Sequence, residues 1–134
     1  MTAIIKIEGV GDVYAAKLQE AGVNSVEAML KVCATPQGRK DLAETTDISD
    51  KLILEWANRA DLARIKGVST QYSDLLEAAG VDTIPELARR NPQNLYQAMV
   101  STNEIKSLVR KLPTEKQVAG WVDQAKALPR ALEY

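Results

Sequence analysis

The chain has 134 residues, 46% of them hydrophobic, and its 17 Lys and Arg residues face 18 Asp and Glu residues for a net charge of −1. This length suits one ordinary domain or two small domains that share a core. Domains that bind duplex DNA strongly are usually basic, with a pI above about 9. The pI of this chain is about 5.5, so any basic surface must be local.

The chain contains no histidine and one cysteine, Cys33, which excludes catalysis that depends on histidine. Without imidazole there is no histidine base, no histidine-activated nucleophile and no histidine ligand for zinc. Carboxylate and lysine chemistry stay possible, but no pair of carboxylates stands out as a catalytic constellation. We therefore expect that the protein is not an enzyme, and that it has no metal site and no cofactor. Cys33 lies among apolar residues, which predicts a buried structural thiol.

The sequence also lacks any run of about 18 apolar residues, so we expect no membrane span. Its first residues, MTAIIKIEGVGD, become polar too early for a signal peptide. These two observations predict a cytoplasmic protein.

The predicted elements begin with a weak strand-like alternation over residues 3–7, and residues 2–8 are too few for a full helix. The segment GVGDVYAAKLQEAGV, residues 9–23, then combines a glycine-rich turn with an amphipathic helix. Asp12 stands where it could cap the amides of that helix. Gly22 stands where helices commonly end in a left-handed residue.

Capping residues predict the helices that follow. Asn24 and Glu27 have the spacing of a capping box, Thr35 precedes a proline, and Ser49 opens a helix that carries Trp56.

A repeat starts near residue 65. Residues 67–81, GVSTQYSDLLEAAGV, match residues 9–23 at seven of fifteen positions, 58 residues further along the chain. Residues 118–125, VAGWVDQA, resemble residues 53–60, ILEWANRA, at a distance of 65 residues. The larger distance implies seven extra residues in the second copy, in a longer helix or loop. The capping residues of the second copy are Thr83, Asn91 and Thr114.

The pattern I-x-G-V-G-x-x-x-A-x-x-L-x-x-x-G-V, followed by a capped helix, resembles the helix-hairpin-helix motif of the SAM-like all-α folds. The whole chain resembles a family of tandem helix-hairpin-helix proteins catalogued as a domain of unknown function. That likeness is carried by ATPQGRKDLAETTDIS, LILEWANRADLARIKGV and AAGVDTIPELARRNP. It implies the fold and supplies no activity.

We therefore expect an all-α protein of about nine short helices, made of two similar helix-hairpin-helix halves packed as one compact body. No linker rich in Gly, Ser or Pro separates the halves, which we place at residues 1–62 and 63–134.

The resemblance also suggests how such a protein could bind a nucleic acid. Hairpin glycines allow a tight turn, and the amides at the start of the next helix can hold a backbone phosphate without reading sequence. The hairpin glycines of this chain are Gly9, Gly11 and Gly67. The first hairpin suits a phosphate poorly, because Glu8 and Asp12 would repel it.

The second hairpin is the better candidate for a nucleic-acid site. The residues that we assign to it are Arg59, Arg64, Lys66, Gly67, Ser69 and Thr70. Ser69 replaces the second glycine, which we interpret as a defect of the motif, although a serine there could cap the helix or touch a phosphate. In the alternative interpretation, Arg59 and Arg64 are solvated charges near the end of a helix, where cations are favoured.

Other candidate side chains are interpreted as structural. Four aromatic residues on apolar helix faces are expected in the cores: Tyr14, Trp56, Tyr72 and Trp121. A basic ridge in the second half is expected to be a solvated face, because acids nearly balance bases there: Arg89, Arg90, Lys106, Arg110 and Lys111.

Two functions remain. The first is a non-enzymatic interaction module that docks a protein partner, and the near-zero net charge and the altered second hairpin favour it. The second is weak, sequence-independent nucleic-acid binding through the second hairpin. The sequence identifies neither the partner nor the oligomeric state.

Overall fold

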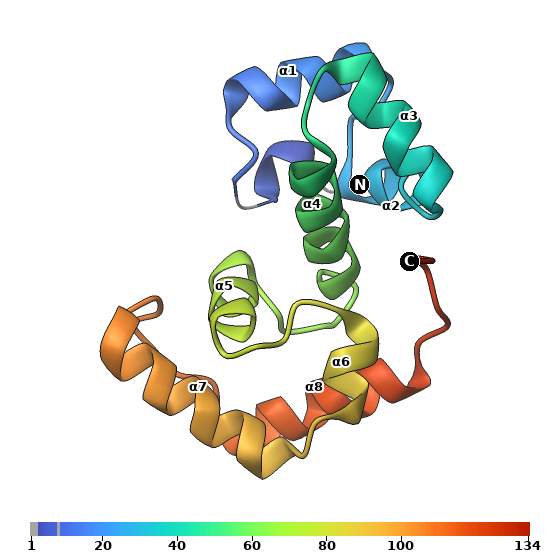
Figure 1. Ribbon diagram of the computed structural model, residues 1–134. Helices are drawn as coiled ribbons and strands as arrows, with labels where there is room; N and C mark the ends of the chain where they lie inside the picture. The colour runs from blue at the N-terminus through green and yellow to red at the C-terminus, as the bar shows by residue number, and fades with distance from the viewer. Residues whose placement is uncertain (1–2, 8) are drawn as a thin grey trace. The chain divides into compact units, whose positions relative to one another are not determined.

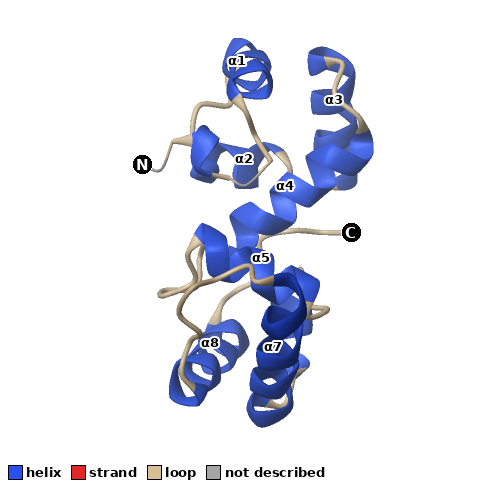
Figure 2. Cartoon of the chain, turned by 90° about the vertical axis from the view of Figure 1, so that its left-hand side faces the viewer, coloured by secondary structure: helices blue, strands red, loops and turns tan. Residues whose placement is uncertain are grey.

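The computed structural model describes residues 3–7 and 9–134, and all regular structure within them is helical (Figures 1 and 2). These residues form one short 3₁₀ helix and eight α-helices, which confirms the all-α class. The strand-like segment forms the 3₁₀ helix η1 (Ile4–Lys6), beside an isolated bridge between Ala3 and Ser25. The three residues of η1 agree with the prediction that no full helix precedes Gly9.

The chain divides into two compact units, of which the first holds residues 1–61 and 130–134 and the second holds residues 62–129. The sequence had suggested a boundary after residue 62 and had placed the last five residues in the second half. That the two halves pack as one body stays a prediction.

The first unit is built from η1 and four α-helices, and their buried side chains form one core. Within the core, Leu18, Met29, Ile53 and Trp56 are all at most 1% exposed. The helices are α1 (Asp12–Glu20), α2 (Val26–Val32), α3 (Pro36–Thr46) and α4 (Asp50–Leu62), whose last residue belongs to the second unit.

The C-terminal residues join the first unit through specific contacts. Leu132 is 1% exposed within the core of that unit. The Glu133 amide donates to the Ala34 carbonyl at 2.7 Å, and the Tyr134 hydroxyl donates to Asn58 Oδ1 at 2.7 Å. The sequence gives no sign of this association, because residues 130–134 form no regular structure and so carry no helical periodicity.

The second unit contains four α-helices around a core of its own, in which Leu75, Leu87, Met99 and Trp121 are at most 2% exposed. Its helix α8 packs against α6 and α7, and α5 packs against α7. The helices are α5 (Thr70–Ala78), α6 (Ile84–Arg89), α7 (Pro92–Lys106) and α8 (Glu115–Ala127).

Most predicted caps are present. Thr35, Ser49, Thr83 and Asn91 each accept a hydrogen bond from the backbone amide three residues on. Thr114 forms the full capping box with Gln117. The prediction at Asn24 was wrong by one residue: Ser25 is the N-cap of α2, and its Oγ accepts from the Ala28 amide at 3.0 Å. Asn24 and Ser25 are both good caps, so sequence alone did not separate them.

The extra residues of the second copy lie in both a helix and a loop. Helix α7 has 15 residues where α3 has 11. The segment before α8, residues 107–114, is longer than residues 47–49 before α4. Helices α1 and α5 begin 58 residues apart, as the repeat suggests. That residues 9–33 superpose on 67–91 stays a prediction.

Candidate functional site

The candidate site is the second glycine turn, residues 67–69, which leads into α5. Gly67 has a φ of +95°, a conformation that side chains rarely adopt. A Cβ atom on Gly67 would lie 3.0 Å from Nε1 of the buried Trp121. Glycine is therefore favoured at this position for two reasons: the backbone has a positive φ, and it packs directly on the indole.

A glutamine side chain holds the residue before this turn by both of its backbone groups. The Lys66 amide donates to Gln124 Oε1 at 2.8 Å, and Gln124 Nε2 donates to the Lys66 carbonyl at 3.1 Å. Our sequence interpretation missed Gln124. The alignment of residues 53–60 with 118–125 pairs Gln124 with Arg59, but no local pattern indicates that the partner of Gln124 is Lys66, 58 residues away.

Ser69 is the N-cap of α5, which confirms that it can cap the helix, whereas its interpretation as a defect was wrong. Ser69 has φ −79° and ψ 173°, an ordinary extended conformation, and its Oγ accepts a 3.3 Å hydrogen bond from the Tyr72 amide. The corresponding Gly11 has φ −82°, with no atom within 4 Å of a built Cβ. The backbone at this position therefore does not require glycine, and serine adds a helix cap.

The structure brings five of the six predicted site residues together in the second unit. Lys66, Gly67, Ser69 and Thr70 are exposed around the start of α5, and Arg64 is half-buried nearby in the sequence. The Arg64 guanidinium donates to the Pro129 carbonyl at 2.8 Å. Thr70 also takes part in an interaction of its own.

Arg59, the sixth predicted residue, lies in α4 and belongs to the first unit. Arg59 is half-buried and has an interaction partner within the protein. The predicted cluster of three cations is therefore divided between the two units, and Lys66 is its exposed member, since Arg59 and Arg64 are half-buried.

The first glycine turn, residues 9–11, shows the same relation to a tryptophan. Gly9 has a φ of +89°, and a Cβ there would lie 3.3 Å from Trp56 Nε1. The prediction that Asp12 caps α1 was wrong, because Gly11 is the N-cap and Asp12 is the first helical residue. Asp12 still places negative charge at the positive end of the helix. The predicted effect of Glu8 lies outside the described residues.

Each glycine turn packs on a tryptophan that is paired with a tyrosine. These rings contact each other and do not form a surface for base stacking. The rings of Tyr14 and Trp56 meet edge to face with centroids 5.1 Å apart, and those of Tyr72 and Trp121 lie 5.4 Å apart. Both tryptophans are at most 2% exposed, which confirms the prediction that they are core residues. The Tyr72 hydroxyl donates to the Lys111 carbonyl at 3.0 Å.

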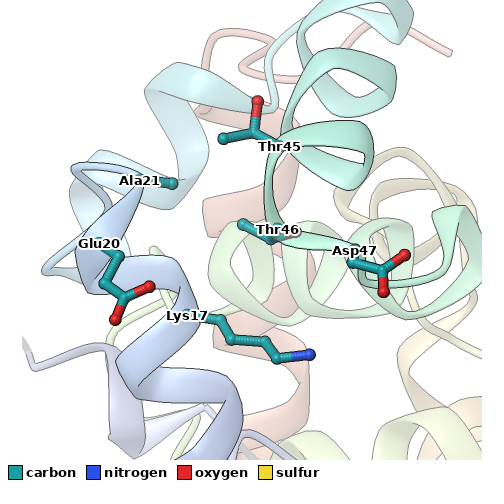
Figure 3. Close-up of a pocket in the computed structure, with 6 residues that line it drawn as sticks. All are labelled: Lys17, Glu20, Ala21, Thr45, Thr46 and Asp47. Carbon is teal, nitrogen blue, oxygen red and sulfur yellow. The ribbon is translucent and has the colours of Figure 1, made fainter.

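An open pocket of about 380 Å³ lies in the first unit between α1 and the end of α3 (Figure 3). Its six lining residues are Lys17, Glu20, Ala21, Thr45, Thr46 and Asp47. The Thr46 hydroxyl is already used, since it donates to the Leu42 carbonyl at 2.7 Å. Two carboxylates and one ammonium group remain as the charged groups of the lining, a mixture that favours neither an anion nor a metal ion.

Cys33 is a buried structural thiol, as predicted. It is 0% exposed, and its Sγ lies 3.8 Å from Met29 Sδ. Burial raises the pKa of Cys33 to about 12, although the positive charge of Arg39 acts in the opposite direction. A thiol with this pKa is almost wholly protonated near neutral pH, so it is a poor nucleophile and a poor metal ligand.

Within residues 3–7 and 9–134, no group of three or more His, Cys, Asp and Glu residues is arranged to hold a metal ion. None of the helices formed by those residues is both long enough and apolar enough to cross a membrane.

Fold and turns together define a small all-helical protein of two compact units, each with a glycine turn packed on a buried tryptophan. The chain belongs to the family described as "Domain of unknown function (DUF4332)", whose model matches residues 8–128. No curated protein and no solved structure matches the chain.

Proposed function

We propose that the protein is a non-enzymatic, cytoplasmic interaction module, built from tandem helix-hairpin-helix units, that docks a protein partner. The observation that carries this proposal is the contact of each hairpin glycine with a buried indole, at Gly9 with Trp56 and at Gly67 with Trp121. Hairpins that pack on a core tryptophan stabilise the units, and the exposed faces of the helices are then available to bind a protein partner.

The hydrogen bonds of the second hairpin support the same view. Gln124 takes up both backbone groups of Lys66, and Arg64 directs its guanidinium to the Pro129 carbonyl. These groups are used within the protein and would have to exchange partners to bind a phosphate. The net charge of −1 adds no general attraction for a nucleic acid.

Co-purification tests the proposal. The tagged full chain is recovered from cells and washed at about 0.5 M salt, where contacts between exposed charges are largely screened. We expect one protein to remain bound in a constant ratio and to re-form the complex after separate purification. If no protein remains while nucleic acid is retained at low salt, protein docking is contradicted.

Weak nucleic-acid binding through the second hairpin is the second candidate, and the exposed side chain of Lys66 favours it. Lys66, Ser69 and Thr70 lie around the start of α5, a helix of nine residues whose N-terminal end carries partial positive charge. Few phosphates would be neutralised, so binding would be non-specific and would fall as salt rises.

Duplex binding separates the two candidates. The parent, Lys66→Glu and the control Lys6→Glu are compared at about 20 mM salt, where the contribution of each phosphate contact is greatest. Loss of binding in Lys66→Glu alone would support the second candidate. Equal loss in both variants would indicate diffuse charge, and absence of binding by the parent would leave protein docking as the function.

A further inference from the structure

The C-terminal end of α7 and the loop after it carry exposed side chains that take no part in the core. We name this surface the basic tip and define it by Ile105, Lys106, Leu108, Arg110 and Lys111, all of which are exposed. Ile105 is 83% exposed and Leu108 is 36% exposed, although both are large aliphatic residues. In Figure 1 this segment is the orange end of α7 with its following loop.

The loop that carries the basic tip is held in place by its own contacts. The Asn103 side chain accepts from the Val109 amide at 3.0 Å and donates to the Val109 carbonyl at 3.1 Å. The Tyr72 hydroxyl binds the Lys111 carbonyl, and the Val109 side chain is 7% exposed in the core. The exposed aliphatic residues are therefore presented on a fixed backbone, which lowers the entropy cost of binding.

The basic tip coincides with the part of the second unit that has no counterpart in the first. Helix α7 is longer than α3, and residues 107–114 replace the short connection of residues 47–49. Each unit closes its own core, the first with Leu132 from the C-terminal residues and the second with Val109 from the additional segment. The exposed side chains of the basic tip belong to neither core.

Local charge sets the kind of partner that fits. Residues 105–111, IKSLVRK, contain three cations and no acid in a chain whose net charge is −1. Lys106 can be explained by its place in the last turn of α7, where a cation is favoured. Arg110 and Lys111 follow the helix and have no such explanation.

We propose that the basic tip docks an acidic, amphipathic segment of a protein partner, an inference that rests on the function proposed above. Aliphatic side chains of such a segment would cover Ile105 and Leu108, and its carboxylates would face Lys106, Arg110 and Lys111. A nucleic-acid backbone would pair with the cations but would leave Ile105 uncovered. A membrane surface is usually bound through a larger apolar face with several large side chains.

A random peptide library displayed on phage and selected against the full chain tests the proposal. Selected peptides are synthesised, and their affinity is measured for the parent and for the double variant Ile105→Ser, Arg110→Glu. We expect selected peptides to combine Asp or Glu with aliphatic or aromatic residues. Their affinity should fall at least about tenfold in the double variant, because an apolar anchor and a complementary charge are both lost.

Matched controls use an apolar residue and a cation that are exposed elsewhere. Val13→Ser replaces a residue that is 72% exposed on α1, and Lys31→Glu reverses an exposed charge on α2. Both controls should leave the affinity unchanged. Helical circular dichroism and the melting temperature of every variant establish that the fold is retained.

Other results would overturn the proposal that the basic tip docks an acidic segment. Peptides that bind the double variant as well as the parent would place docking elsewhere and would still support an interaction module. A selection that yields no peptide would overturn it as well, and co-purification would then decide the proposed function independently. The proposal would also be overturned if no acidic peptide binds and if the parent instead binds phosphatidylserine vesicles or duplex DNA, with that binding lost in the double variant.

Discussion

The Cβ position of Gly67 lies 3.0 Å from Trp121 Nε1, closer than side chains ordinarily approach. The backbone of the turn therefore lies close against the indole, which would have to shift by a few tenths of an ångström to admit a methyl group. The first unit has the same relation at 3.3 Å between Gly9 and Trp56. In each unit, the glycine that resembles a ligand-binding residue is explained by the packing of a large core side chain.

Gly67→Ala should destabilise the second unit more than Gly80→Ala does. Both glycines have positive φ, +95° and +99°, so both variants place a side chain in an unfavourable conformation at a cost of about 1–2 kcal/mol. Only at Gly67 must Trp121 also move, since the nearest atom at Gly80 is Arg90 Nη1 at 3.8 Å. Urea unfolding followed by helical circular dichroism gives the two free energies.

Equal losses at Gly67 and Gly80 would show that the indole yields easily, and that the close approach does not constrain the turn. The near-ultraviolet circular dichroism of tryptophan adds a second readout. It should change in Gly67→Ala and remain as in the parent for Gly80→Ala.

Trp56→Ala should lower the free energy of unfolding by about 3–5 kcal/mol, the usual cost of truncating a buried Trp. Trp56 is 1% exposed and supports both Tyr14 and the turn at Gly9. Trp56→Phe, which keeps an aromatic ring, should lose less. An unchanged denaturant midpoint in Trp56→Ala would mean that the tryptophan is not a core residue in solution.

Gln124→Ala should destabilise the second unit by about 1–2 kcal/mol, because it leaves both backbone groups of Lys66 without their side-chain partner. Lys66→Ala keeps the same backbone groups and should have a much smaller effect. Hydrogen exchange measures the predicted consequence directly, since the Lys66 amide should exchange faster in Gln124→Ala. Unchanged exchange would show that this contact does not hold the turn.

Local sequence patterns predicted the helices well and predicted contacts between distant residues poorly. Caps such as Thr35 and Thr114 depend on neighbours three residues away, so the sequence contains the whole interaction. The partner of Lys66 is Gln124, 58 residues away, and Tyr134 reaches Asn58 over 76 residues. Such contacts depend on the tertiary fold, which periodicity does not encode.

The candidate site illustrates the same limit. The sequence shows the positive charges of Arg59, Arg64 and Lys66. It does not show that the Arg64 guanidinium donates a hydrogen bond to the Pro129 carbonyl. Ser69 was interpreted as a defect because the sequence motif has glycine at this position. Its backbone angles show that the position never needed glycine.

The pH dependence of stability should reveal the buried thiol. Burial raises the pKa of Cys33 from 9.0 to about 12, so above pH 9 the unfolded chain loses a proton that the folded chain keeps. The stabilisation linked to the protonated thiol is complete below pH 9 and is lost as pH rises toward 12. Cys33→Ala should lack this component, and the difference in unfolding free energy between parent and variant should therefore shrink as pH increases. A constant difference would contradict the raised pKa.

The carboxyl of Glu86 provides a second pH test, in the acid range. A side-chain hydrogen bond with Asp82 raises the pKa of Glu86 above its ordinary value of 4.5, and partial burial acts in the same direction. The protonated group is therefore the one that the folded state favours. Its contribution to stability is complete below the ordinary pKa and is lost as pH rises through the raised value.

Glu86→Gln keeps the acceptor for the 3.1 Å hydrogen bond from the Thr83 hydroxyl, and its amide can donate to Asp82 without a proton from solvent. The variant should therefore gain stability relative to the parent as pH rises from about 3 to 7, the range in which carboxyl groups ionise. Asp82→Asn removes the main cause of the shift, so Glu86→Gln should show little of this pH-dependent gain in an Asp82→Asn background. Urea unfolding of the four chains at several pH values completes the cycle. A gain that is the same with and without Asp82 would mean that the two carboxyl groups are not coupled.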